Sequence, residues 1–172
     1  MLRIKSMCNG FDLPTEAQWE YACRAGTTTA LNSGKNVTGL DSCPNVDEVA
    51  RYIGNSNPDV AGRSEVSKRN TDLSAGTMSV GAYLPNAFGL YDMHGNVWEH
   101  CLDATELIPT GFIDPKGCPT PSQYHQVRGA SWLTDASAII SGYHHVYKGI
   151  GHIQTSHESH VGFRICLHDA TV

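Results

Sequence analysis

The chain has 172 residues, 17 of them acidic and 12 basic, and a net charge of −5 at pH 7. A chain of this length can bury most of its apolar surface around one core, so we expect a single domain over residues 1–172. The negative charge and the lack of a basic run give no support for nucleic-acid binding. No apolar run approaches the roughly 18 residues of a membrane span. Residues 1–8 lack the apolar stretch of a secretory signal, so the sequence indicates no compartment.

The first predicted element is a helix from Glu16 to Arg24. Thr15 and Gln18 have the spacing of a capping box, in which each side chain satisfies a backbone N–H of the other residue. Gly26 follows the helix and provides a residue suited to ending it. One face of this helix carries Trp19, Ala22 and Cys23.

The rest of the chain predicts little regular structure. Residues 27–82 are rich in Gly, Ser, Thr, Asn and Asp, which favours loops, with a short helix near residues 46–52. Alternating polar and apolar residues predict three short strands, at 79–83, 126–132 and 161–167. Residues 104–123 contain four prolines and predict a long surface connection.

Four motifs occur in a fixed order along the chain. The most distinctive is Asn-Ala-Phe-Gly-Leu-Tyr-Asp-Met-His-Gly-Asn-Val-Trp-Glu at residues 86–99. Leu-Pro-Thr-Glu-Ala-Gln-Trp-Glu-Tyr-Ala-Cys-Arg-Ala-Gly precedes it at 13–26, and Val-Arg-Gly-Ala-Ser-Trp at 127–132 and Val-Gly-Phe-Arg at 161–164 follow it. In this order they resemble the formylglycine-generating enzyme (sulfatase-modifying factor) family over about residues 12–167.

The resemblance implies an α+β fold of the C-type-lectin-like kind, in which much of the chain is irregular. It covers the later part of that family's domain, so the chain is either a minimal version of the fold or lacks its beginning. Aromatic and aliphatic side chains of the motifs are the expected core. They are Trp19, Tyr21, Phe88, Leu90, Tyr91, Trp98, Trp132 and Phe163.

The same resemblance argues against catalysis. The oxygen-dependent enzyme of the family binds copper through two cysteines shortly after its Arg-Gly-Gly-Ser motif and oxidises a substrate cysteine. The matching segment here, residues 132–141, contains no cysteine, so we expect this chain not to be an enzyme. For the six cysteines, the resemblance nominates one disulfide, Cys8 with Cys166, and the alternative is buried free thiols.

Two metal sites are candidates. In the family the Gly-Asn-Val-Trp-Glu turn surrounds a hard cation with oxygen ligands, which assigns Asn96 and Glu99 to calcium. The alternative is that Asn96 satisfies a tight turn and that Glu99 pairs with Arg164. A second site could use the five histidines after residue 143, although scattered surface histidines explain them more simply, because their spacing fixes no ligand geometry. These histidines are His144, His145, His152, His157 and His160.

Residues 133–160 lie between two motifs but lose both the family resemblance and any regular period. The segment resembles the variable proteins of diversity-generating retroelements, in which replaced template adenines turn asparagine codons into Tyr, His, Asp, Ser, Thr and other residues. Such side chains suit a binding surface, because Tyr and His offer large contact areas with few rotatable bonds. The candidate ligand-binding residues are Leu133, Thr134, Asp135, Ser137, Tyr143, His144, His145, Tyr147, His152, His157 and His160. A family member that drifted after losing catalysis is the alternative origin.

We therefore expect a non-catalytic protein that binds a protein or another surface ligand through residues 133–160, with no cofactor required for binding. A virion or cell surface is the location that such recognition would suit. Two other functions remain open. One is a metal-dependent oxidoreductase-like activity, and the other is a structural module of a virion or cell surface.

Overall fold

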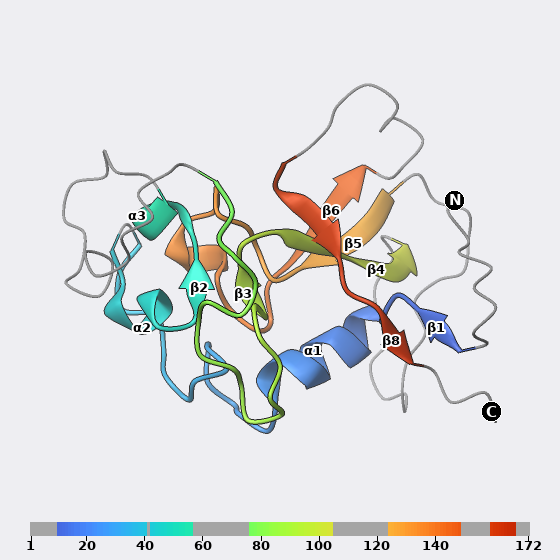
Figure 1. The fold of residues 1–172 in the computed structure, drawn as a ribbon, viewed down its shortest axis with the longest axis horizontal. Coiled ribbons are helices and arrows are strands. Elements are labelled where there is room, and N and C mark those ends of the chain that lie inside the picture. The colour runs from blue at the N-terminus through green and yellow to red at the C-terminus, as the bar shows by residue number, and fades with distance from the viewer. Residues whose placement is uncertain (1–9, 41, 57–75, 105–123, 149–158, 168–172) are drawn as a thin grey trace.

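The computed structural model describes residues 10–40, 42–56, 76–104, 124–148 and 159–167. It is a small α+β fold with few helices and much irregular chain, as the sequence predicts (Figure 1). Within the described part, no helix is long and apolar enough to cross a membrane. The elements in chain order are β1 (Phe11–Asp12), α1 (Glu16–Arg24), α2 (Pro44–Asp47), β2 (Ala50–Arg51), α3 (Ile53–Ser56), β3 (His94–Gly95), β4 (Trp98–Ala104), β5 (Tyr124–Arg128), the 3-10 turn η1 (Ala136–Ala138), β6 (His144–Lys148), β7 (Val161–Phe163) and β8 (Cys166–Leu167).

Helix α1 has the predicted bounds and the predicted capping box. The Thr15 side chain accepts from the Gln18 backbone, and the Gln18 side chain accepts from the Thr15 backbone at 3.1 Å. The end of the helix differs in detail from the prediction. Ala25 takes the left-handed conformation, with φ of 46°, and Gly26 follows with φ of 90°.

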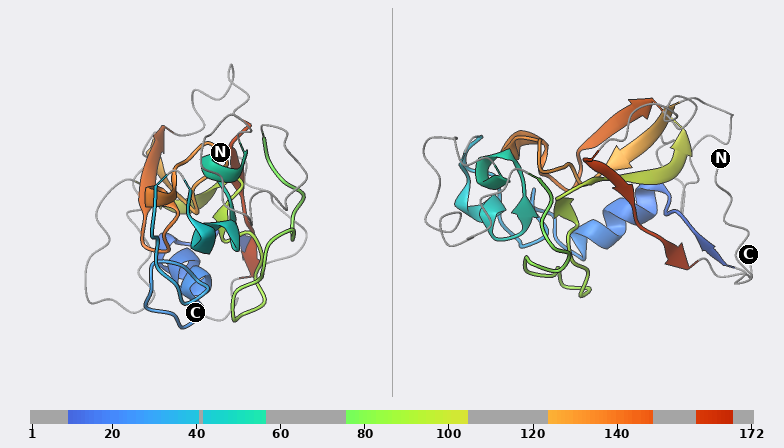
Figure 2. Two further views of the ribbon diagram at one scale, coloured as in Figure 1. Left: turned by 90° about the vertical axis from the view of Figure 1, so that its left-hand side faces the viewer. Right: turned by 45° about the horizontal axis from the view of Figure 1, so that its top comes forward.

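A four-stranded sheet in the order β6-β5-β4-β7 is the main layer. The pairs β4–β5 and β5–β6 are antiparallel, whereas β4–β7 is parallel. Helix α1 lies along one face of this sheet and contacts β4 and β5 (Figure 2). Because successive side chains of a strand point to opposite faces, the sheet divides its residues between the α1 side and the outer side.

Two smaller pairings connect distant parts of the chain. Strand β2 pairs in parallel with β3, and β1 pairs antiparallel with β8, where Asp12 lies opposite Cys166. The β1–β8 pairing places the chain just before the first motif beside the chain just after the last one. Cys8 lies outside the described residues, so its predicted disulfide with Cys166 stays a prediction.

The core confirms some expected residues and corrects others. Trp19 and Trp98 are buried, but four aromatic residues expected inside are exposed: Tyr21, Phe88, Tyr91 and Phe163. Leu90 and Trp132 are only half-buried. Tyr21 is exposed because it lies two positions from Trp19 and so faces away from the sheet, where its ring meets Phe88 at 5.6 Å. Residues outside the motifs fill the core instead, among them Leu31, Val46, Tyr52 and Ile139.

Four predicted elements are wrong or shifted. Residues 79–83 form turns and no strand, and the helix expected near 46–52 is replaced by α2 and strand β2. The strand expected at 126–132 is β5, which ends at Arg128 because Gly129 and Ala130 both have positive φ. The predicted closing strand is divided into β7 and β8.

Candidate functional site

The outer side of the sheet carries an aromatic group centred on Trp98 at the start of β4. The Tyr143 ring lies 6.1 Å from the Trp98 ring, and the His145 ring lies 5.6 Å from it, both tilted. Trp98 is buried, whereas Tyr143 and His145 are exposed. The two predicted contact residues therefore rest on a fixed framework ring and present their other faces to solvent.

Strand alternation divides the predicted residues of β6 between the two sides. His145 lies opposite Val127 on the outer side, and the backbone of Tyr147 is paired opposite His125. His144 points the other way, where its Nδ1 lies 3.1 Å from the Glu16 carboxylate on α1. Of the histidine pair at 144 and 145, only His145 therefore belongs to the Trp98 group.

The predicted residues near η1 lie in a different place. The Thr134 carbonyl accepts from the Ile53 backbone at 3.0 Å, so this segment packs beside α3 and not on the sheet. Figures 1 and 2 show η1 next to α3 and β2 and apart from β6. Leu133, Asp135 and Ser137 are exposed there, and Thr134 is half-buried. The structure thus separates the predicted surface into two parts.

The remaining predicted contacts are partly described. His160 is half-buried, and its carbonyl accepts from the Trp98 backbone at 2.8 Å. His152 and His157 lie outside the described residues. Within the described part no group of three or more His, Cys, Asp or Glu side chains could hold a metal ion.

Arg128 fixes the backbone on which the Trp98 group depends. Its side chain is fully buried between β5 and α1, where it pairs with Glu20 and lies 5.5 Å over the Trp19 ring. Its Nη1 donates to the Tyr143 carbonyl at 2.8 Å. Burial alone would raise the pKa of Glu20, but hydrogen bonds and charges from Arg24 and Arg128 hold that pKa below its ordinary value. Sequence reasoning missed Arg128, although its place in a matched motif was a signal.

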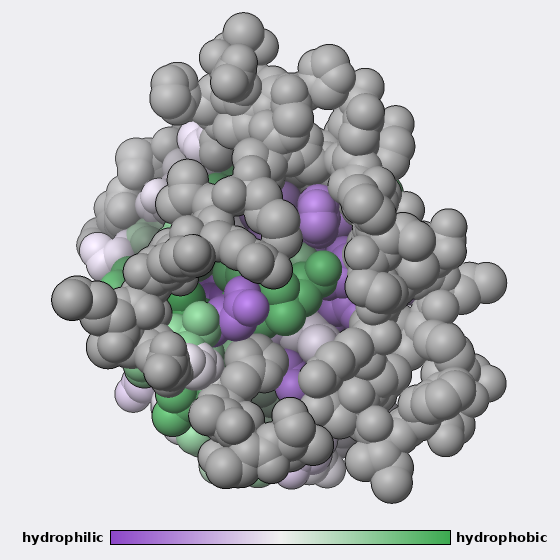
Figure 3. All heavy atoms as spheres, turned by 90° about the vertical axis from the view of Figure 1, so that its right-hand side faces the viewer, coloured by the Kyte–Doolittle hydropathy of each residue, from purple (hydrophilic) through white to green (hydrophobic). Residues whose placement is uncertain are grey.

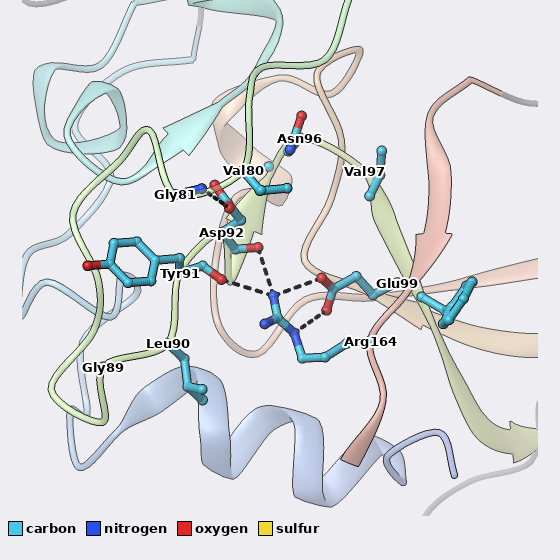
Figure 4. A pocket seen from close by; sticks show the side chains of 12 residues that line it. Val80, Gly81, Gly89, Leu90, Tyr91, Asp92, Asn96, Val97, Glu99 and Arg164 are labelled. Carbon is cyan, nitrogen blue, oxygen red and sulfur yellow. Dashed lines mark hydrogen bonds and ion pairs between the residues drawn. The ribbon is translucent and has the colours of Figure 1, made fainter. Parts of the chain in front are cut away.

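Glu99 and Asn96 adopt the arrangement of the turn-and-ion-pair alternative. Arg164 donates to both Glu99 oxygens, at 2.9 and 3.0 Å, and Trp19 Nε1 donates to Oε2 at 2.7 Å. The Asn96 amide exchanges two hydrogen bonds with the Met78 backbone, and Asn96 has φ of 65°. Both predicted calcium ligands thus have protein partners, and the Asn96 amide lies apart from the Glu99–Arg164 pair (Figure 4). Calcium at these residues stays a prediction.

A pocket of about 530 Å³ opens beside the Glu99–Arg164 pair (Figure 4). Its walls come from residues 80–81, 89–92, 95–97 and 163–164 together with Glu99. Figure 3 shows the face of the molecule that lies at the right-hand side of Figure 1, where described hydrophobic and hydrophilic residues are neighbours. The pocket could not be predicted from the sequence, because its walls meet only in the folded chain.

Comparison with known proteins agrees with this architecture. The sulfatase-modifying factor enzyme 1-like domain matches residues 3–169 of the chain. The chain belongs to this family. A formylglycine-generating enzyme from Thermomonospora curvata is 33% identical over 162 residues, which are 90% of this chain and 48% of that relative. An inactive C-alpha-formylglycine-generating enzyme 2 from Mus musculus is 28% identical over 156 residues, 90% of this chain and 42% of the relative.

Among solved structures, Treponema denticola variable protein 1 is similar to this family member with a TM-score of 0.68 and 29% identity. The match covers 93% of this chain and 48% of that one. The predicted resemblance to variable proteins is therefore confirmed at the level of fold and sequence. The chain spans about half the length of the curated relatives it matches.

Three of the four described cysteines of this sulfatase-modifying factor family member lie inside the fold. Cys23, Cys43 and Cys101 are buried. Burial raises the pKa of Cys23 to about 12 and raises the pKa of Cys101 further still, so both remain protonated at neutral pH. Burial also acts to raise the pKa of Cys43, but hydrogen bonds, chiefly from Thr38, lower it overall. A thiolate pair suited to copper would need two deprotonated sulfurs side by side.

Proposed function

We propose that this protein binds a protein or another surface ligand without catalysing a reaction, and that its contact surface is a retroelement-diversified part of residues 133–160. The observation that carries the proposal is the position of Tyr143 and His145. Both are exposed on the outer side of the sheet, and both rest on Trp98, a buried residue of a framework motif.

The framework beneath this surface supports the proposal. Arg128 holds the Tyr143 carbonyl from within the core, so the backbone entering β6 is fixed by a residue that faces away from the ligand. Strand β6 is then paired with β5 along its length. A backbone that is already fixed loses little conformational entropy when a ligand binds, and this favours affinity.

Sequence and fold likeness support the same function. The likeness to a solved variable protein, with a TM-score of 0.68 and 29% identity, supports a contact surface that varies. Residues 132–141 lack the cysteine pair of the family's enzyme. Two buried thiols, Cys23 and Cys101, are held in the protonated form, which is unsuited to copper binding.

A binding experiment tests the proposal. The labelled protein is applied to an array of host surface proteins, and bound partners are compared with those of a triple variant, Tyr143→Ala, His145→Ala and Tyr147→Ala. We expect affinity to fall at least roughly tenfold, as for contact residues at the centre of an interface. Leu84→Ser, a change at an exposed residue outside 133–160, should leave these partners bound. Equal binding by the triple variant would refute the proposal.

Oxidation of a substrate cysteine is the second candidate function. Relatives that share 32–33% sequence identity with this chain are named formylglycine-generating enzymes. The test is oxygen consumption by the copper-loaded protein in the presence of a cysteine-containing peptide. The binding proposal predicts consumption equal to that of copper in buffer. Turnover that depends on the folded protein would favour the enzyme.

A further inference from the structure

The described lining of the pocket beside Glu99 and Arg164 has more negative than positive side chains. It includes two carboxylates, Asp92 and Glu99, and one guanidinium, Arg164. Arg164 and Glu99 neutralise each other through two hydrogen bonds. Asp92 has no ion-pair partner within the described part of the chain, and its Oδ2 accepts from the Gly81 backbone at 2.7 Å. Among the described residues, one carboxylate charge is therefore left at the pocket wall.

The pocket also has apolar walls. Val80 and Val97 both line it, Val97 lies apart from Val80, and the Asp92 side chain lies beside Val80 (Figure 4). Phe163 adds to the lining next to Arg164. Val80 is 85% exposed and Phe163 is 63% exposed, so apolar surface continues from the lining onto the rim. A ligand with an apolar stem and a charged end would match this distribution.

We propose that this pocket binds the arginine or lysine side chain of a partner protein. The cationic end would lie at Asp92, and the methylene stem would lie between Val80 and Val97. Apolar residues that flank the basic one in the partner would cover the exposed rim. The net charge of −5 of the whole chain favours approach of a basic segment. The described lining includes no residue of 133–160, so the site is independent of the proposed surface in that segment.

An anionic ligand fits the pocket less well. Among the described residues, Arg164 is the only cation of the lining, and its Nη2 already donates to Glu99 and to the backbone carbonyls of Tyr91 and Asp92. An anion would compete with Glu99 for Arg164 and would meet the Asp92 charge. A cation meets an unpaired carboxylate and displaces no existing ion pair.

The test compares two capped peptides that differ only in charge: acetyl-Leu-Arg-Leu-amide and the same peptide with citrulline in place of arginine. Each is titrated into isotope-labelled protein, and the backbone amide shifts of Gly81, Gly89 and Gly95 are followed by NMR. We expect the arginine peptide to bind more tightly than the citrulline peptide, by up to about fivefold, as for a partly exposed ion pair. Equal affinities, or no shifts at these three residues, would overturn the proposal.

Asp92→Asn is the decisive variant. Asparagine keeps an oxygen for the Gly81 N–H and tolerates the left-handed conformation of residue 92, which has φ of 54°, so the fold should be retained. The variant should lose the preference for arginine over citrulline. Asp135→Asn removes another exposed carboxylate, at the start of η1, and should keep the preference. Thermal unfolding of both variants checks their folding.

Propylguanidinium alone identifies the source of the cation. We expect it to bind more weakly than the arginine peptide, because it leaves Val80 and Phe163 uncovered. Equal or tighter binding of propylguanidinium would assign the pocket to a small cation and overturn the assignment to a partner protein. Preference for arginine retained by Asp92→Asn would also overturn it.

Discussion

Glu99 joins three of the four sequence motifs through one carboxylate. It accepts from Trp19 of the first motif and from Arg164 of the last, while belonging itself to the second. The pairing with Arg164 could be anticipated as an alternative to calcium, because opposite charges in matched motifs suggest a pair. The Trp19 bond could not, since an indole N–H leaves no pattern that identifies a distant acceptor.

Replacing Glu99 by Gln keeps the size of the side chain and removes its charge. Arg164 then loses its counter-charge, and one of its two bonds to residue 99 meets an amide donor. We expect the free energy of unfolding in urea to fall by about 2–3 kcal/mol, less than for a fully buried pair because Arg164 is partly exposed.

Calcium provides the control for this interpretation of Glu99. If the carboxylate serves only Trp19 and Arg164, adding calcium to chelator-treated wild-type protein leaves the melting temperature unchanged. A rise in melting temperature that disappears in Glu99→Gln would instead assign calcium to Asn96 and Glu99.

His94 gives the fold a dependence on pH. It is buried, its Nε2 accepts from the Asn32 backbone at 3.2 Å, and burial, together with the charge of Arg24, lowers its pKa from 6.5 to about 4. The neutral form is therefore the folded form. Its contribution to stability is complete above about pH 6.5, the unfolded value, and is lost as the pH falls towards 4.

The pH effect of His94 can be measured by urea unfolding at pH 7.5 and pH 4.5. The wild type should lose at most about 3 kcal/mol from this group between the two conditions. His94→Gln should lose less over the same range, because glutamine does not titrate. An identical loss in the two proteins would show that other groups cause the effect.

At the scale of elements, local signals predicted helix α1 but not the short strands. The capping box of Thr15 and Gln18 acts within four residues, so it can be identified in the sequence. Strands β2 and β3 have two residues each and exist through pairing between residues more than 40 positions apart. Such pairing leaves no period in the sequence, which is why residues 46–52 were expected to be a helix.

The β2–β3 contact depends on Gly95. A Cβ atom at this position would lie 2.2 Å from the Arg51 carbonyl oxygen, and the residue has φ of 72°. Gly95→Ala should therefore lower the free energy of unfolding by about 2–4 kcal/mol, through a backbone clash added to conformational strain. Gly34→Ala is the matched control, because Gly34 has φ of 80° and open space around it. Similar losses in the two variants would exclude the clash as the cause.

At the scale of the whole molecule, exposed Tyr143 and His145 rest on a buried framework residue, Trp98. The sequence located the segment 133–160 as unusual but not its division, because only the pairing of β6 shows that His144 turns to α1 and His145 to Trp98. The sequence likewise could not show that residues 133–137 pack beside α3. Both outcomes depend on contacts between distant segments.

Exchanging Tyr143 and His145 tests whether these two residues serve binding and not folding. The double variant Tyr143→His and His145→Tyr keeps a ring next to Trp98 at both positions but changes the chemistry presented to a ligand. We expect the free energy of unfolding to stay within about 1 kcal/mol of wild type, because aromatic contacts are conserved, while partner binding changes at least roughly tenfold. Unfolding of this variant would mean that the two residues are structural.

The origin of residues 133–160 is tested most directly by sequencing the gene and its surroundings. A diversified binding protein predicts a near-copy of the codons for 133–160 close to a reverse transcriptase gene, with mismatches confined to adenines of that copy. A near-copy with mismatches at all four bases, or a complete locus without such a copy, would contradict diversification and favour a drifted member of the family.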